Sequence, residues 1–169
     1  MSDPAATAPR HGRLRHWAPR VVLAGVAAFA LIQLVPYGRA HANPPVRSQP
    51  SWDSARTKAL FAQACGACHS NLTTWPWYSN VAPVSWLVQH DVDDGRGRFD
   101  VSDWRQQPQP AADRVAQAVL SGHMPPLQYK LIHSEARLSS AQRAALAAGL
   151  QRTFRNSPPP LISVRHRDG

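Results

Sequence analysis

The residues with the clearest chemical meaning form one five-residue string, Cys65-Gly66-Ala67-Cys68-His69, which holds both cysteines of the chain. Two thiols separated by two residues and followed directly by a histidine form the attachment signal for a c-type haem. Each thiol can add across one vinyl group of the porphyrin, and the adjoining imidazole can then bind the iron. The string therefore predicts one covalent haem c per chain, held by Cys65 and Cys68, with His69 as an axial ligand.

Three other interpretations of the two cysteines fit the sequence less well. A thioredoxin-like redox pair belongs to a βαβ unit, and no neighbouring segment is typical of a strand. A disulfide across so short a loop adds little stability, because the stabilisation by a cross-link grows with loop length. A tetrahedral zinc site normally needs a second close pair of ligands, whereas His90, His123 and His133 are scattered along the chain.

Met124 is the best candidate for the second axial ligand of the iron, because the chain has no other methionine after its first residue. It lies in the string Gly122-His123-Met124-Pro125-Pro126, and prolines hold a loop in a fixed course. A rigid loop of this kind suits a thioether, because such a weak ligand must already be held in the right position to bind the iron. Filling a gap in the core is the alternative role for this methionine. His123, His90 and His133 remain alternative ligands.

The elements that must position these residues are helical, with four segments typical of helices and no convincing strand. The first is expected to start at Ser51 or Asp53, either of which can cap a helix, and to run into Cys65. The expected bounds of the other three are Pro83 to Asp94 or Gly95, Pro110 to Gly122, and Ser139 onward. We therefore predict a mostly α, small cytochrome c-like domain over residues 51–156, packed around a covalent haem.

The last of these segments has the strongest helical signal. Ser139 and Gln142 are spaced as a capping box, and Leu146, Leu150 and Phe154 then repeat every four residues, as on one face of a helix. The sequence thus predicts a long helix whose apolar face packs against the rest of the domain.

The N-terminal region combines basic residues with an apolar run from Val21 to Val35. Aromatic residues flank the run at Trp17 and Tyr37, as at the two surfaces of a membrane. We expect residues 21–37 to form a single transmembrane anchor, with residues 1–20 as a basic cytoplasmic N-terminus, although fifteen apolar residues are fewer than the roughly 20 of a typical span. A signal peptide cleaved at Ala40-His41-Ala42 is the alternative. Both place the remaining chain outside the cytoplasm.

The net charge of +9 lies at the two ends of the chain rather than on the predicted domain. Residues 1–50 hold six arginines against one aspartate, residues 151–169 four against one, and residues 51–150 nine basic against eight acidic residues. A nearly neutral domain argues against a nucleic-acid partner. Residues 38–50 are expected to form a proline-rich linker, and residues 157–169 a disordered basic tail.

Beyond the attachment string the sequence continues as Thr74-Trp75-Pro76-Trp77-Tyr78-Ser79 and then from Val81 to Val92. With Asn43-Pro44-Pro45-Val46 and Met124-Pro125-Pro126, these stretches resemble the bacterial haem-binding domain family of small membrane-anchored, c-type cytochrome-like proteins, over about residues 43–150. The resemblance implies covalent haem on both cysteines, His69 as an axial ligand and a cytochrome-like helical fold. The sequence departs from the family at His123, where an acidic residue is more common.

Four aromatic residues near the string are candidates for lining the porphyrin, because their rings are apolar and their edges polar. They are Trp75, Trp77, Tyr78 and Trp86. An ordinary aromatic core cluster is the alternative for each of them. Arg96, Arg98 and Arg105 are candidates for pairing with the haem propionates, with solvated surface charge as the alternative.

These features predict an electron carrier rather than an enzyme. The expected site is the periplasmic face of the bacterial cytoplasmic membrane, where the His/Met-ligated haem would exchange electrons with a redox partner of the respiratory chain or periplasm. The alternatives are a peroxidase-type haem enzyme and a haem-based redox or ligand sensor, each of which needs an open or exchangeable sixth position on the iron.

Overall fold

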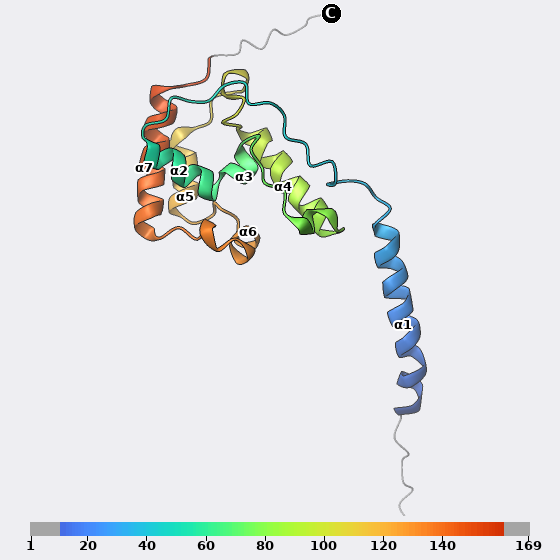
Figure 1. Cartoon of the computed structure of the whole chain (residues 1–169). Coiled ribbons are helices and arrows are strands. Elements are labelled where there is room, and N and C mark those ends of the chain that lie inside the picture. Colours follow the sequence, from blue (N-terminus) through green and yellow to red (C-terminus); the bar gives the residue numbers. More distant parts are fainter. Residues whose placement is uncertain (1–10, 161–169) are drawn as a thin grey trace, which may run out of the picture.

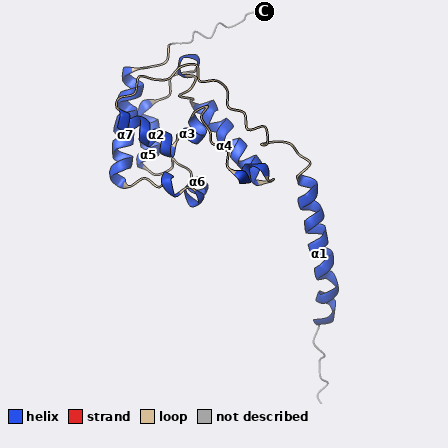
Figure 2. Cartoon of the chain, in the orientation of Figure 1, coloured by secondary structure: helices blue, strands red, loops and turns tan. Residues whose placement is uncertain are grey.

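The computed structural model describes residues 11–160, and side chains from Trp17 onward. Within this part the chain forms seven α-helices and three short 3-10 helices, joined by loops, with no strand (Figures 1 and 2). The α-helices are α1 (His11–Ile32), α2 (Ala55–Ala64), α3 (Gly66–His69), α4 (Val84–Arg98), α5 (Ala112–Leu120), α6 (Leu127–Ile132) and α7 (Ser140–Asn156). The 3-10 helices are η1 (Trp77–Asn80), η2 (Trp104–Gln106) and η3 (Ser134–Ala136). The predicted mostly α fold class is confirmed.

The four helices expected from the sequence correspond to α2, α4, α5 and α7. The first begins later than predicted, because Ser54 is its cap and accepts a hydrogen bond from the Thr57 amide at 3.1 Å. Asp53 instead forms an ion pair with Arg152 on α7, with Oδ1 2.7 Å from Nε. The predicted start at Ser51 or Asp53 is therefore wrong by a few residues, and Asp53 joins two helices rather than capping one.

The start of α7 confirms the predicted capping box. The Ser139 hydroxyl accepts from the Gln142 amide at 3.2 Å, and the Gln142 side chain accepts from the Ser139 amide at 2.8 Å. Leu146, Leu150 and Phe154 are fully buried. The four-residue repeat in the sequence thus marks the face of α7 that enters the core.

The hydrophobic core lies where α2, α5 and α7 meet, and Figure 1 shows these helices side by side. The Phe154 ring lies 4.7 Å from the Trp104 ring and 5.6 Å from the Phe99 ring, measured between centroids. Because Phe99 follows directly after α4, this aromatic contact joins the helical core to the segment that ends α4. The core therefore fixes the position at which α4 ends.

The segment expected to be a free linker lies against the domain instead. The Arg96 guanidinium donates to the Ala42 carbonyl at 3.0 Å and to the Asn43 side chain at 2.9 Å, and its Nε donates to the Ser70 carbonyl at 3.1 Å. Further along, the Ser48 amide donates to the Ser102 carbonyl at 3.1 Å. Part of residues 38–50 is thus held against the domain by hydrogen bonds.

The beginning of the predicted tail also packs on the domain. The Trp104 indole donates to the Ser157 carbonyl at 2.7 Å, and Pro159 is buried. Residues 161–169 of the predicted tail, and residues 1–10 of the predicted cytoplasmic N-terminus, lie outside the described residues.

The helix α1 extends away from the domain (Figure 1), and Gln33, just after its end, exchanges two hydrogen bonds of 3.0 Å with the backbone of Ala82. The helix ends at Ile32 and does not continue through residues 21–37. Its apolar part, Val21 to Ile32, would be about 18 Å long, against a bilayer core of about 30 Å. Within the described part of the chain, no helix combines the length and the apolar character that a membrane crossing requires. The predicted transmembrane anchor is therefore not supported.

The close approach of α7 to α2 depends on a glycine. A Cβ at position 149 would overlap the buried side chain of Thr57 on α2, lying 2.9 Å from its Cβ. We expect Gly149→Ala to destabilise the protein by about 1–3 kcal/mol through overpacking, despite the better helix propensity of alanine. Denaturant unfolding of the haem-loaded protein measures this change.

Gly97→Ala is the matched control, because Gly97 is exposed on α4 and a Cβ there would have no atom within 4 Å. This variant should be neutral or stabilising by up to about 1 kcal/mol. Equal stability of the two variants would contradict the close packing of α2 on α7.

Candidate haem site

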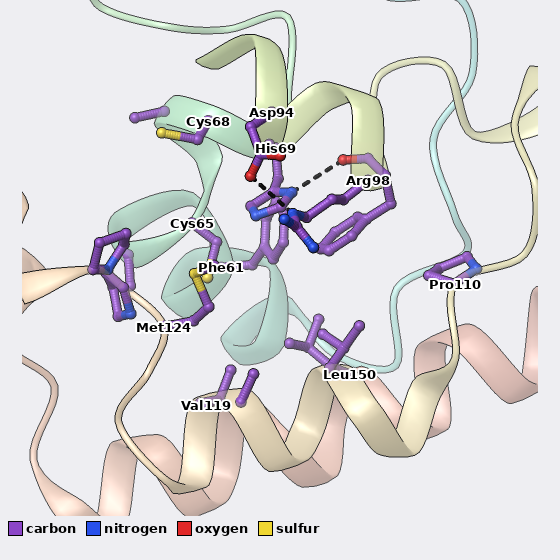
Figure 3. Close-up of a pocket in the computed structure, with 18 of the residues that line it drawn as sticks. Phe61, Cys65, Cys68, His69, Asp94, Arg98, Pro110, Val119, Met124 and Leu150 are labelled. Carbon is purple, nitrogen blue, oxygen red and sulfur yellow. Dashed lines mark hydrogen bonds and ion pairs between the residues drawn. The ribbon is translucent and has the colours of Figure 1, made fainter. Parts of the chain in front are cut away.

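A cavity of about 370 Å³ lies between α2, α3, α4, α5 and the loop that precedes α6. Both cysteines, His69 and Met124 border it (Figure 3). Apolar side chains form much of the remaining wall, including Val119 of α5 and Leu150 of α7, which Figure 3 shows together on one side. The volume is within the range of about 300–1,000 Å³ usual for ligand pockets.

The two thiols are placed by the junction of α2 and α3. Cys65 ends α2, with its amide bonded to the Phe61 carbonyl at 2.8 Å. Its own carbonyl accepts from the amides of Cys68 at 3.1 Å and His69 at 3.0 Å, which starts the single turn of α3. This turn brings both cysteines and the histidine to the same cavity.

Both thiols are neutral at physiological pH. Burial raises the pKa of Cys65 to about 12, and the neighbouring Cys68 adds to the shift. Burial also raises the pKa of Cys68 to about 11, and the negative charge of Asp91 acts in the same direction. The pair is therefore poorly suited to a redox role that depends on a low-pKa thiolate.

The His69 imidazole is buried and held in one orientation. Its Nδ1 lies 3.1 Å from the Phe99 carbonyl, and its ring stacks on the Phe99 ring at a centroid distance of 4.1 Å and an interplanar angle of 14°. Because a carbonyl only accepts, Nδ1 carries the hydrogen, and Nε2 keeps its lone pair for a metal. Burial lowers the pKa of His69, which favours the neutral, ligating form.

Met124 reaches the same cavity from a later segment of the chain. It follows the end of α5, and its amide donates to the Ala118 carbonyl at 3.0 Å. Pro125 and Pro126, which come next, also border the cavity. The structure thus brings the predicted second ligand to the cavity of the attachment string, and its bond to the iron stays a prediction.

The sequence pattern of the haem-binding domain family matches residues 27–152 of the chain. The chain belongs to the haem-binding domain family. The matched range contains the whole of α2 to α6, most of α7 and all four residues with sulfur or imidazole groups at the cavity. Neither the curated proteins nor the solved structures include a match to the chain.

The residues at the cavity of this haem-binding protein fit the cofactor. Cys65 and Cys68 offer neutral thiols, His69 offers the Nε2 of a buried imidazole, and Met124 offers a thioether. The apolar wall suits the porphyrin, which is largely hydrophobic. Phe61 and Tyr129 also border the cavity, and neither was predicted. Phe61 lies one helical turn before Cys65 on α2, so the helical spacing from the attachment string could have identified it. Tyr129 lies far along the sequence from that string, and no local signal marks it.

The four aromatic residues predicted to line the haem do not border this cavity, and their contact with a haem stays a prediction. They are Trp75, Trp77, Tyr78 and Trp86. The short helix η1 turns this segment away from α3 and packs it against α4. Trp75 stacks on His41 at 4.9 Å, while Trp77 is 79 % exposed. The segment next to the attachment string in sequence therefore lies beside a different part of the fold.

Of the arginines considered for the propionates, Arg98 borders the cavity, and Arg96 and Arg105 do not. Arg98 pairs with Asp94, with Nε 2.8 Å from the carboxylate (Figure 3), and this contact lowers the pKa of Asp94. Arg114 of α5 also lines the cavity and was not considered from the sequence. Arg98 and Arg114 are therefore the cations placed to meet an anionic cofactor group.

The alternative histidine ligands are also absent from the cavity lining. His90 and His123 are exposed, and the His123 ring bonds the Ser121 hydroxyl at 2.8 Å. His133 bonds the Tyr78 hydroxyl instead. Among the four predicted candidates for the second ligand, Met124 alone borders the cavity.

The crossing of α4 over α3 requires a glycine next to the attachment string. A Cβ at Gly95 would lie 2.8 Å from the Cys68 Cβ and would also overlap the Cys68 carbonyl. We expect Gly95→Ala to displace α3, to lower the haem content of the purified protein and to destabilise it by about 1–3 kcal/mol. The pyridine haemochrome absorbance per protein chain measures the haem content.

Gly97→Ala again serves as the control, since it adds the same methyl group two residues along α4 in open space. Its haem content should equal that of the native protein. A full haem complement in Gly95→Ala would show that α3 and α4 do not constrain each other.

Proposed function

We propose that this haem-binding protein is an electron carrier with its haem attached covalently to Cys65 and Cys68. The observation that supports the proposal is the shared cavity of two neutral thiols, an oriented imidazole and a loop-held methionine. A haem with histidine and methionine ligands supplies one-electron transfer at a raised reduction potential.

The residues of the chain have separate tasks in this proposal. Cys65 and Cys68 would each hold the haem through one thioether, and the turn of α3 sets the spacing of the two thiols. Phe99 fixes the imidazole of His69, so that Nε2 does not rotate away from the metal. Met124 is held by its backbone bond to Ala118 and by the prolines after it. His69 and Met124 would together hold the iron from two sides and leave no position for a substrate, which favours a carrier over a peroxidase or a sensor.

The proposal includes a place outside the cytoplasm and a protein redox partner. Support comes from the attachment string, because thioether bonds to haem are formed outside the cytoplasm, and from the basic residues before the apolar stretch that starts at Val21, a pattern typical of exported segments. The periplasm is the compartment that fits both features.

The ligation of the iron is tested by Met124→Ala. We expect the native protein to give a low-spin spectrum with the far-red thioether-to-iron band and no response to carbon monoxide. The variant should lose the band and bind carbon monoxide, because one iron position opens. His123→Ala removes the exposed neighbour and should change neither property. An unchanged spectrum in Met124→Ala would remove Met124 from the site.

Covalent attachment is tested by the single and double serine variants of the two cysteines. The native chain should carry haem through denaturing electrophoresis, with an intact mass increased by one haem. Cys68→Ser should lose most of its attached haem, and Cys65→Ser with Cys68→Ser should lose all of it. Haem that stays bound to the double variant after denaturation would overturn covalent attachment and leave only a non-covalent site.

A further inference from the structure

Arg96 on α4 is a cation whose hydrogen bonds all go to neutral oxygen atoms. Its Nε donates to the Ser70 carbonyl at 3.1 Å, and its Nη1 donates to the Ala42 carbonyl at 3.0 Å. Its Nη2 donates to the Asn43 side chain at 2.9 Å and to the Thr73 hydroxyl at 3.0 Å. In the part of the chain whose side chains the structure describes, no carboxylate forms an ion pair with this guanidinium. The charge of Arg96 is therefore held in one place without a paired anion.

Arg98 and Arg114, which line the cavity, have different electrostatic surroundings. Arg98 pairs with Asp94 at 2.8 Å, and its side chain is 66 % exposed (Figure 3). Arg114 is exposed and borders the cavity, where the anionic propionates of a haem would offset its charge. Arg96 is partly buried and does not border the cavity. Its charge is thus neither paired with an acid nor placed to meet a propionate.

Arg96 lies beside the segment that carries the axial histidine. Ser70, whose carbonyl accepts from Arg96, follows His69 directly in the chain. The helix α4 crosses α3 at Gly95, the residue before Arg96, where a Cβ would lie 2.8 Å from the Cys68 Cβ. Burial raises the pKa of the Cys68 thiol, and the charge of Arg96 acts in the opposite direction. The electric field of the guanidinium therefore reaches the attachment string.

We propose that Arg96 raises the reduction potential of the haem iron by acting as a fixed positive charge beside the His69 segment. The proposal rests on the proposed haem site. One electron passes from the redox partner to the iron, and no bond forms or breaks in this step. The oxidised iron carries one more positive charge than the reduced iron, so a nearby cation destabilises the oxidised form more. Arg96 touches no ligand of the iron and acts through its field.

The surroundings of Arg96 keep its charge effective. Burial lowers the pKa of Arg96, and Asp100 and Asp93 act in the opposite direction at longer range. A guanidinium stays protonated in proteins, so the charge persists at physiological pH. Burial also raises the pKa of Asp100, which disfavours the anion nearest in effect to Arg96. Solvent screens a partly buried charge less than an exposed one.

The N-terminal segment takes part in holding this charge. Ala42 and Asn43 supply two of the four acceptors of Arg96, and Ser70 and Thr73 supply the others. Because these four acceptors fix the guanidinium in advance, it does not have to move when the iron changes oxidation state. The segment before the domain thus contributes to the electrostatic environment of the site.

A spectroscopic redox titration of the haem-loaded protein, with dithionite and soluble mediators, tests the charge of Arg96. At one fixed ambient potential, we expect the ratio of reduced to oxidised haem to fall roughly tenfold in Arg96→Gln. This is the order of magnitude for two unit charges about 10 Å apart at an effective dielectric constant of about 20. Arg96→Lys keeps the charge and should keep a ratio close to that of the native protein. A purely structural role would shift both variants alike, because both lose hydrogen bonds.

Arg105→Gln is the matched control, because Arg105 is exposed and does not border the cavity. It removes the same charge from a position where water and salt screen it, so the ratio should change by less than about twofold. An equal shift in Arg105→Gln, or no shift in Arg96→Gln, would overturn the proposal.

Asn43→Asp tests the same charge while Arg96 stays in place, and so does not depend on the folding of an Arg96 variant. The new carboxylate would replace an amide oxygen that lies 2.9 Å from Arg96 Nη2, and would neutralise the guanidinium by pairing with it. We expect the ratio of reduced to oxidised haem to fall, as in Arg96→Gln. Asn43→Ala also loses the 2.8 Å bond from Asn43 to the Thr73 carbonyl but adds no charge, and should keep the native ratio. An unchanged ratio in Asn43→Asp would contradict the proposed role of the charge.

The result is distinguishable from failure of the proposed haem site. Failure of covalent attachment or of Met124 ligation shows in denaturing electrophoresis or in the far-red band of the native protein. Failure of the present proposal shows instead as equal reduction ratios in native, Arg96→Gln and Asn43→Asp proteins with the same haem content by pyridine haemochrome absorbance.

Discussion

The hydrogen bond from His69 Nδ1 to the Phe99 carbonyl is the constraint on which the site depends. Phe99 ends α4 with its amide bonded to the Gly95 carbonyl at 3.1 Å, and the Val101 amide returns a 3.0 Å bond to the His69 carbonyl. The histidine is thus held through its side chain and its backbone by the same short segment. Because the Phe99 ring also contacts Phe154 of α7, the orientation of one imidazole is tied to the packing of the whole core.

The sequence predicted the helices that carry local signals at their ends or along one face. The long helices α4 and α7 carry proline, capping and periodicity signals, and Met124 could be selected because it is the sole internal methionine and is followed by two prolines. The short helices α3 and α6 have too few residues for a helical periodicity to be recognised in the sequence. Family resemblance identified the domain, and Phe61 is within one helical turn of Cys65. The contact of Tyr129 with the cavity, in contrast, arises only when distant segments fold together.

The aromatic block shows why proximity in sequence misleads. Trp75 to Tyr78 follow the attachment string within ten residues, yet η1 turns them toward α4, and a tyrosine from α6 takes the place at the cavity. Large rings close to a haem motif are expected to line the cofactor, yet none of these three borders the cavity. The turn at η1 depends on contacts with α4 that no local pattern encodes.

The bonds of Arg96 to Ala42, Asn43 and Ser70 have a consequence for how the domain meets other molecules. Together with the two hydrogen bonds between Gln33 and Ala82, they hold the segment that follows α1 against the domain. The cavity therefore keeps a fixed orientation relative to this N-terminal segment. Any molecule that docks at the cavity would meet a face whose direction is set by the chain's own N-terminal segment.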